Sequence, residues 1–385
     1  MSGRSDSSLR RFANTQYGNA ERLAHHFGRD IRYCSEWKTW LVWDGARWKK
    51  TDTSRINQFA YQTVRRILGE IPPRKQQPTD TERQFDQSIA RWAFRSENRH
   101  ELESMVALAQ SLPEVLVTPN DFDQNRMLLN VRNGTLNLRT GQLSPHRRED
   151  LITRVAPVNF RPHAVCPTWL KFLNRIFNEE TALIAFIQRV IGYTLTGDVS
   201  EKVLFIPHGS GNNGKTTLVE TIRGLLGDDY AGVMNIEVLT TEGSSSDRLH
   251  AIAELFGKRF ITASESEQGE ALREAMVKNL TGMGRLKGRH MYSSAFEFDP
   301  TFKLFIDANH LPQIRGSDPA IWDRIRRIPF NVSIPKEERD KKLIQKLRAE
   351  LPGILTWAVE GCLGWQSQGL RTPTAVETAV EEYRE

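Results

Sequence analysis

The chain has 385 residues, of which 39% are hydrophobic and 26% are charged, so it can bury a core and does not have a disordered composition. Its three cysteines are far apart, which excludes a disulfide framework and a cysteine-rich zinc site and favours a reducing compartment. No apolar run is long enough for a membrane helix and no secretory signal is visible, so a cytoplasmic protein without a membrane partner is expected.

The formal net charge of +6 is not evenly distributed. Residues 1–160 contain 25 Lys and Arg against 18 Asp and Glu, whereas the rest of the chain contains 28 against 29. Either the N-terminal region contacts nucleic acid or the charge only solvates its surface, and both interpretations stay open. The sequence changes in character around Pro157, Pro162 and Pro167, which predicts a domain boundary there. We expect a small α+β N-terminal region (1–160, DNA-binding or collar) and a second domain (165–370). Residues 371–385 are expected to start a C-terminal helix that would continue in a longer chain.

The N-terminal region is predicted to combine helices with hairpins. A helix fits residues 19–27, and the turn pair Asp44-Gly45 predicts a hairpin between flanking aromatic residues. One long helical region is expected over residues 81–112, and the turn Asn133-Gly134 joins two short strands. Tryptophans crowd around the first hairpin, where they fit either a small core or base stacking beside basic residues (Trp37, Trp40, Trp43, Trp48, with Arg47, Lys49 and Lys50).

From residue 168 onward, predicted helices and strands alternate. Such alternation is typical of an α/β fold, a mostly parallel sheet with helices on both faces. Strands are expected at 202–207, 259–263 and 302–307, and a hairpin-like stretch at 284–298. Helices are expected at 167–177, 181–195, from Lys215, at 271–280, 336–348 and 354–365, and again from residue 374.

The strongest single motif is a phosphate loop, GxxxxGK[ST], between an apolar strand and a helix. Backbone N–H groups of such a loop turn inward on a β-phosphate, and the helix N-terminus adds positive potential. Lys215 is expected to reach the β- and γ-phosphates, and the Thr216 hydroxyl to bind Mg²⁺. The predicted nucleotide-binding residues are Gly209, Ser210, Gly211, Asn212, Asn213, Gly214, Lys215, Thr216 and Thr217.

Polar side chains after two later strands could complete this site. Glu265 follows the 259–263 strand, expected beside the phosphate loop, and is favoured as the acid that holds Mg²⁺ and orients the attacking water, with Glu267 as second candidate. Asn309 follows the 302–307 strand, where an amide could bind the γ-phosphate. Several arginines within 318–327 could act on a neighbouring subunit's phosphate.

These motifs in this order carry a family resemblance. GSGNNGKT, ITASESE, LTGMGRLKGRHMYSSAFEF, KLFIDANHLP and DPAIWDRIRRIPF together resemble superfamily 3 helicases, and more closely the helicase part of phage and plasmid primase–helicases, which include poxvirus-type enzymes. The resemblance covers residues 165–370. Upstream, GNAER at 18–22 and WLVWDG at 40–45 are similar to the region that precedes this core.

The resemblance implies an AAA+-type P-loop ATPase core that forms a homo-hexamer and moves 3′→5′ on single-stranded DNA, using ATP and Mg²⁺. Glu265 then corresponds to the Walker B acid, Asn309 to sensor 1 and Arg324 to the arginine finger. A channel hairpin within 278–298 would contact DNA through its basic residues (Arg285, Lys287, Arg289, His290). By composition alone, these four would be a solvated basic edge.

The implied function is that of a replicative helicase of a phage, prophage or plasmid, in the bacterial host cytoplasm if phage-encoded. Single-stranded and forked DNA, a primase and other replication proteins are the implied partners. A ring-forming loader or scaffold regulated by ATP, or a packaging-type motor, is the alternative. Two departures from the family pattern matter: Ser266 separates the two acids, and Gly282-Met283-Gly284 lacks an acid that relatives carry. A primase domain needs clustered acids, and Asp121-Phe122-Asp123 is predicted to be a loop.

Overall fold

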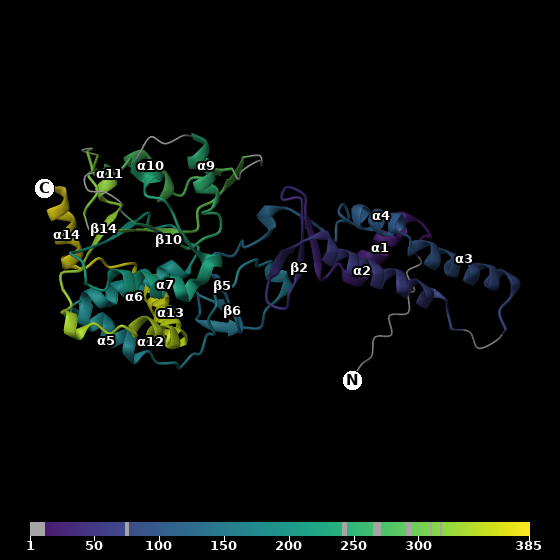
Figure 1. The fold of residues 1–385 in the computed structure, drawn as a ribbon, viewed down its shortest axis with the longest axis horizontal. Helices are drawn as coiled ribbons and strands as arrows, with labels where there is room; N and C mark the ends of the chain where they lie inside the picture. The colour runs from purple at the N-terminus through teal and green to yellow at the C-terminus, as the bar shows by residue number, and fades with distance from the viewer. Residues whose placement is uncertain are drawn as a thin grey trace. The chain divides into compact units, whose positions relative to one another are not determined.

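The computed structural model describes residues 12–73, 77–240, 245–264, 271–289, 295–308, 310–315 and 318–385. The chain forms two compact units, each described by itself (Figure 1). The N-terminal unit runs to Gln124 and includes Arg148–Thr153. The C-terminal unit comprises Asn125–Arg147 and Arg154–Glu385, so the strands within 125–147 pack with the later part of the chain.

Helices make up one layer of the N-terminal unit: α1 (Gln16–Phe27), α2 (Thr53–Arg66), α3 (Asp80–Ser96) and α4 (Arg99–Ala109), with the 3-10 turn η1 (Ile67–Glu70). Thr15, Asp52 and Thr79 cap the first three helices by accepting backbone N–H groups, as N-cap side chains do. The single long helix predicted over 81–112 is wrong. The chain breaks after Ser96, since Asn98 is extended, and α4 then buries Met105 in the core shared with α1.

The sheet of the N-terminal unit has the order β3-β2-β1-β4, built from β1 (Ile31–Cys34), β2 (Thr39–Trp43), β3 (Trp48–Thr51) and β4 (Leu116–Val117). The predicted hairpin is confirmed: Trp43 pairs with Trp48, and Gly45 takes a φ of +102° in the turn. Trp40 and Trp48 are buried at 2% and 0% exposure, so these two serve the core and cannot stack on bases.

The acids of the Asp121-Phe122-Asp123 segment hold local structure. Asp121 caps the 3-10 turn η2 (Pro119–Asp121) through Thr118. Asp123, at a φ of +54°, accepts the backbone N–H and the hydroxyl of Thr153. The segment is a loop, as predicted.

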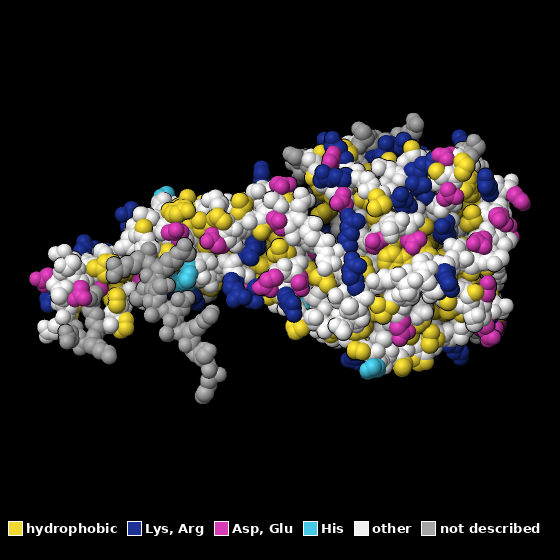
Figure 2. All heavy atoms as spheres, turned by 180° about the vertical axis from the view of Figure 1, so that it is seen from behind, with side chains coloured by type: hydrophobic (Ala, Val, Ile, Leu, Met, Phe, Trp, Pro, Cys, Tyr) yellow, Lys and Arg dark blue, Asp and Glu magenta, His cyan; other side chains and the backbone are white. Residues whose placement is uncertain are grey.

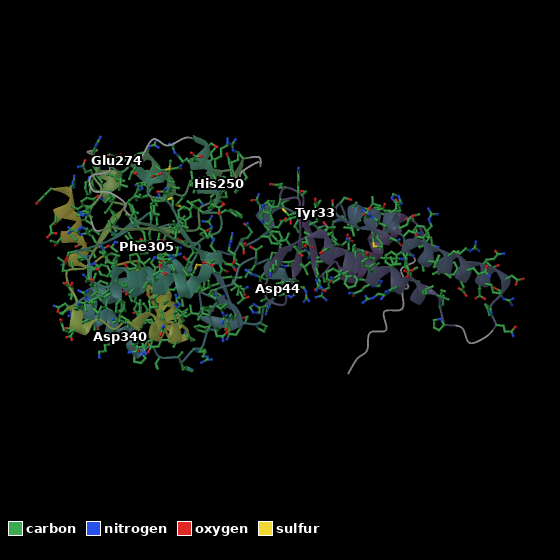
Figure 3. The ribbon with its side chains drawn as sticks, in the orientation of Figure 1. Tyr33, Asp44, His250, Glu274, Phe305 and Asp340 are labelled. Atoms are coloured by element: carbon green, nitrogen blue, oxygen red, sulfur yellow. The ribbon has the colours of Figure 1, made fainter. Side chains whose placement is uncertain are left out.

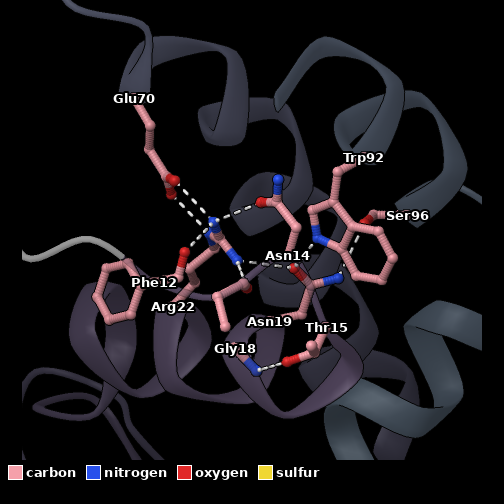
Figure 4. A network of polar contacts seen from close by, with 10 residues as sticks. Phe12, Asn14, Thr15, Gly18, Asn19, Arg22, Glu70, Trp92 and Ser96 are labelled. Atoms are coloured by element: carbon pink, nitrogen blue, oxygen red, sulfur yellow. Dashed lines mark hydrogen bonds and ion pairs between the residues drawn. The ribbon is translucent and has the colours of Figure 1, made fainter. Parts of the chain in front are cut away.

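A buried polar network surrounds Arg22 of α1 (Figure 4). The Arg22 guanidinium, 1% exposed, meets both carboxylate oxygens of Glu70 at 2.6 and 2.7 Å. Asn19, one turn earlier, donates to the Ser96 hydroxyl and accepts from the Trp92 indole N–H, both at 2.9 Å. The sequence GNAER therefore ties α1 to η1 and α3, and its side chains serve architecture.

We expect Arg22→Ala to destabilise the N-terminal unit by about 3 kcal/mol or more, because removing one partner of a buried ion pair strands the other. Urea unfolding followed by circular dichroism measures this. The matched control is Arg99→Ala, whose pair with Glu103 is exposed and should leave the midpoint nearly unchanged. Equal midpoints for the two variants would contradict a structural role for the network.

The C-terminal unit is built on a five-stranded sheet in which every pairing is parallel, with the order β14-β8-β13-β10-β9. The strands are β8 (Leu204–His208), β9 (Ala231–Val233), β10 (Phe260–Ser264), β13 (Lys303–Asp307) and β14 (Ile325–Pro329). The predicted α/β class with a parallel sheet, preceded by a smaller α+β region, is confirmed. Because the strands are parallel, their carboxyl ends share one edge of the sheet.

Alternation along the strands divides the apolar residues between two cores. Phe205, Phe260 and Phe305 face one side, where their rings meet 4.8 to 4.9 Å apart beside α5 (Pro167–Ile176), α6 (Thr181–Leu195), α7 (Lys215–Tyr230) and α13 (Leu351–Gln368). Leu204 and Ile261 face the other side, toward α8 (Glu237–Thr240), α9 (Ser245–Ala253), α10 (Glu274–Leu280) and α11 (Pro319–Trp322). Helices thus cover both faces, and Phe305 lies between the layers (Figures 1 and 3).

Short elements complete the C-terminal unit. They are β5 (Leu128–Val131), β6 (Gly134–Asn137), β7 (Gln142–Ser144), the hairpin β11 (Leu286–Gly288) and β12 (Phe296–Phe298), the 3-10 turn η4 (Lys336–Glu338), α12 (Leu343–Ala349) and α14 (Thr374–Arg384). In the N-terminal unit, Arg148–Asp150 forms the 3-10 turn η3. Helix α14 packs on the edge strand β14, where Arg327 bonds Ala379 O and Glu382. No helix in the described part of the chain is long and apolar enough to cross a membrane.

Candidate nucleotide site

The phosphate loop joins the end of β8 to the start of α7 and has a sharply turned backbone. Asn212 and Gly214 have φ angles of +62° and +90°, the left-handed region that favours glycine. A Cβ at Gly214 would lie 2.6 Å from Ile176 Cγ2, so this position also needs glycine for packing. The glycine of the motif at position 214 is therefore required both by the backbone conformation and by the close packing of α5.

A side chain inside the loop closes it. Asn213, 3% exposed, donates from Nδ2 to Ser210 O at 2.7 Å, and its Oδ1 accepts the Lys215 backbone N–H at 3.3 Å. These bonds hold the loop in a curved path. Preformed N–H groups at a helix N-terminus are the features that bind phosphate.

Lys215 lies at the centre of the site and is only 4% exposed. Its ammonium donates to Ala308 O at 2.7 Å and to Gly209 O at 3.0 Å, and lies 3.7 Å from Asp307 Oδ1. A buried cation needs such acceptors, since burial without them is costly. The Thr216 side chain, at the first turn of α7, is exposed.

Sequence reasoning missed Asp307, which ends β13 beside the loop. Burial raises the pKa of this carboxyl, and the Lys215 ammonium acts in the opposite direction. An acid two residues before Asn309 was the available signal, because residues two apart in an extended segment point the same way.

A cavity of about 910 Å³ adjoins the loop, which contributes Asn212, Gly214 and Thr217 to its wall. Phe172 of α5 and Ile334, with Leu343 and Ile344 of α12, supply an apolar lining. Basic and acidic side chains also line it (Lys171, Arg175, Glu338, Arg339, Asp340, Lys341, Lys346). A cavity of this size beside a phosphate loop, lined by both apolar and charged side chains, can take a nucleoside.

The position of β10 differs from the expectation. The 259–263 strand was predicted beside the phosphate loop, yet β13 lies between β8 and β10. Long-range strand order is set by packing of the helices, which local sequence does not encode. Four of the predicted site residues lie outside the described residues, so their roles stay predictions: Glu265, Glu267, Asn309 and His290.

Arg324 lies far from the phosphate loop of its own chain. It precedes β14, whose Ile325 pairs with Leu204, five positions before Gly209. At about 3.3 Å per residue, this separates Arg324 from the loop by about 16 Å along the sheet. The Arg324 Nη1 group donates to Ala320 O at 2.7 Å, which fixes the side chain at the opposite edge.

Three predicted DNA-contacting residues lie in or beside the β11–β12 hairpin. Leu286 and Gly288 are buried against α9, so Arg285, Lys287 and Arg289 alternate with them and are exposed. β11 and β12 pair as the hairpin predicted within 284–298, and contact of these residues with DNA stays a prediction. Figure 2 shows Lys and Arg side chains gathered along the edge of the C-terminal unit that carries α9, α10 and α11.

The acid Glu297 lies beside these three cations and forms an ion pair with one of them. Glu297 stands opposite Lys287 in the strand pair, and its carboxylate lies 3.4 Å from Arg285 Nη1. Arg289 donates to the Ser246 hydroxyl at 3.1 Å. Lys287 and Arg289 therefore offer more positive charge to a ligand than Arg285 does.

The fold and the loop define an α/β protein of the P-loop class. Residues 20–178 match the family described as D5 N terminal like, and residues 208–327 match a family of unknown function, DUF5906. The first match includes Arg22 and Glu70, and the second includes the phosphate loop and Arg324.

Relatives with assigned names come from large DNA viruses. A protein of Acanthamoeba polyphaga mimivirus, provisionally named a helicase, is 26% identical over 297 residues, which covers 70% of this chain and 31% of the relative. One of frog virus 3, also provisionally named a helicase, is 30% identical over 168 residues, covering 42% and 17%. One of African swine fever virus, provisionally named a primase, is 25% identical over 232 residues, covering 57% and 24%.

A solved structure supports the fold independently. The apo structure of the NrS-1 C-terminal region superposes with a TM-score of 0.59 over 95% of this chain and 75% of that one, at 12% identity. This chain spans about a third or less of the length of the viral relatives it matches. The chain is thus related to the viral primase–helicases, as its motifs predicted.

Proposed function

We propose that this chain is the motor part of an ATP-dependent DNA helicase that acts in replication. The observation that carries this proposal is the buried Lys215 ammonium in a preformed phosphate loop, with a nucleoside-sized cavity at the loop's flank. Relatives named as helicases supply the DNA-directed part of the proposal.

ATP and Mg²⁺ are the proposed ligands. No three acidic, histidine or cysteine side chains in the described ranges gather as a metal site. Mg²⁺ commonly binds through one or two carboxylates together with substrate phosphates, so it would bind here with the nucleotide. The exposed Thr216 hydroxyl and the predicted Glu265 carboxylate suit that role, and the ion would neutralise charge on the transferring phosphate.

A homo-hexameric ring is the proposed assembly, and the position of Arg324 supports a contact between neighbouring subunits. An arginine at the edge of the sheet opposite its own loop cannot contact its own γ-phosphate, so it needs a neighbouring subunit. A ring in which each Arg324 meets the next subunit's nucleotide would couple hydrolysis to movement on single-stranded DNA.

Strand displacement on forked DNA tests the proposal. We expect ATP-dependent unwinding of a fork with a 3′ tail and none with only a 5′ tail, together with a hexamer mass when nucleotide is added. ATP binding with ring assembly but no displacement would favour the loader alternative. Translocation on double-stranded DNA without unwinding would favour the packaging alternative.

The hairpin is the proposed DNA contact, and Lys287→Ala/Arg289→Ala tests it. Each phosphate contact on a single strand contributes about −0.7 to the slope of log K against log salt. The double variant should therefore flatten the slope by about 1.4 and weaken all sequences alike. Arg285→Ala should change the slope less, because Glu297 already pairs with that cation. Salt-dependent binding to labelled oligo-dT measures the slope for both variants and for the parental chain.

The controls separate the hairpin from other basic surfaces. Lys336→Ala/Lys342→Ala removes two exposed cations near α12 and should keep the parental slope. Lys49→Ala/Lys50→Ala removes two exposed cations of the N-terminal unit. A parental slope in the hairpin variant combined with a flattened slope in the Lys49/Lys50 variant would assign the DNA contact to the N-terminal unit.

A further inference from the structure

The carboxyl end of β13 places an acid between the phosphate loop and the end of β10. Asp307 is the last residue of β13, and in the parallel register it stands beside Ser264, the last residue of β10. On its other side, the following residue Ala308 bridges to His208, where the loop begins. Asp307 thus occupies the middle of the edge at which a nucleotide would bind.

The contacts of Asp307 point into the site. Its Oδ1 lies 3.7 Å from Lys215 Nζ, and the two side chains are 20% and 4% exposed. Within the described ranges, the Lys215 ammonium is the cation that pairs with this carboxylate. The Asp307 carboxylate is partly buried, and burying a charge is costly unless it is paired.

Strand β10 itself ends without an acid, since its last three residues are Thr262, Ala263 and Ser264. In the sequence, Glu265 and Glu267 follow this strand, and Ser266 separates them. We propose that Asp307 supplies the second carboxylate of the nucleotide site, from the neighbouring strand, and that it faces the Mg²⁺ bound with the triphosphate. This inference rests on the proposed function, in which the loop binds ATP.

The charge of Asp307 affects how the loop binds a nucleotide. Without nucleotide, the Lys215 ammonium balances Asp307. When phosphates occupy the loop, they take that ammonium, and an unbalanced carboxylate a few ångströms away repels them. A divalent cation between carboxylate and phosphate turns this repulsion into attraction. Asp307 therefore makes nucleotide binding depend on Mg²⁺.

The test compares nucleotide affinity with and without the ion. A fluorescent ATP analogue is titrated into the full chain in Mg²⁺ and in EDTA. The dissociation constant in EDTA is then divided by the dissociation constant in Mg²⁺. We expect Asp307→Asn to bind the metal-free nucleotide as well as or better than wild type. It should bind the Mg²⁺ complex more weakly, so that the ratio falls at least tenfold. ATP turnover should fall as well.

Matched variants keep the test sharp. Asp299→Asn removes an acid before the other end of β13, where it pairs with Arg126, and should leave the ratio unchanged. Asp307→Glu keeps the charge and should restore part of the ratio. If Asp307→Asn does not fold by circular dichroism, Asp307→Ser carries the same expectation.

An unchanged ratio in Asp307→Asn, or a wild-type affinity that does not depend on Mg²⁺, would overturn the inference and leave the proposed function standing. A wild-type chain that binds no ATP under either condition would overturn both. If Asp307 served only to pair with Lys215, both affinities would change by the same factor, which also counts against the inference.

Discussion

Lys215→Ala is expected to lower ATP hydrolysis to background, a loss on the order of a thousandfold or more, as for loss of a preorganised charge at a developing anion. Lys215 is the cation placed inside the phosphate loop, where it bonds Gly209 O and Ala308 O. Its replacement removes the charge for the β- and γ-phosphates and leaves the Asp307 carboxylate without its ammonium partner. A phosphate-release assay at saturating ATP measures the loss.

Two further variants test whether the loss of ATP hydrolysis is specific to the Lys215 ammonium. Lys171→Ala removes the same charge from the cavity lining, outside the loop, and should retain most of the turnover. Lys215→Met keeps the length of the side chain and should be as inactive as the alanine variant. Appreciable turnover in Lys215→Met, with the fold intact by circular dichroism, would mean that the loop does not hold the hydrolysed nucleotide.

Arg324→Ala should suppress ATP hydrolysis by on the order of a thousandfold while nucleotide binding survives, as for loss of an arginine that acts in trans. The reason is geometric, since Arg324 lies at the edge of the sheet opposite its own loop and the variant leaves that loop untouched. Analogue binding and phosphate release, measured on the same preparation, separate the two effects. Equal losses in binding and turnover would contradict the prediction.

Subunit mixing tests whether the arginine acts on a neighbour. In mixed rings of Arg324→Ala and Glu265→Gln, some interfaces combine an intact arginine with an intact acid, so part of the activity should return. Arg326→Ala is a matched control, because Arg326 bonds Asp323 O and Ile325 O within its own chain. Rings of this variant should hydrolyse ATP without being mixed with another variant. Mixed rings that form but recover no activity at any ratio would exclude the trans role.

Local patterns predicted those features that depend on neighbours in sequence. The Asp44-Gly45 hairpin and the strand–loop–helix around Lys215 follow from turn chemistry and from hydrophobic period, and both are present. The hairpin-like stretch predicted at 284–298 is also present, as the antiparallel pair β11 and β12. The break between α3 and α4 was missed because the helical period runs through Ser96 without a Pro or Gly to interrupt it.

Other features could not be predicted from those patterns. Sequence placed the 259–263 strand beside the loop, whereas the sheet inserts β13 between them and so brings Asp307 to Lys215. Likewise, GNAER is a motif in the sequence, but only packing shows that Arg22 and Asn19 bond to Glu70 and Ser96 far along the chain.

The sequence by itself determined the α/β class, the phosphate loop and the relationship to viral primase–helicases. These rest on residues close together in the chain, whose spacing is dictated by backbone geometry and by the shape of a phosphate. Only the tertiary structure decided the strand order, the acid beside Lys215, the cavity between α5 and α12, and the placement of Arg324 away from its own loop. Each of these depends on how distant segments pack their apolar faces together. That packing brings charged groups into contact, and the local hydrophobic period of the sequence does not predict such contacts.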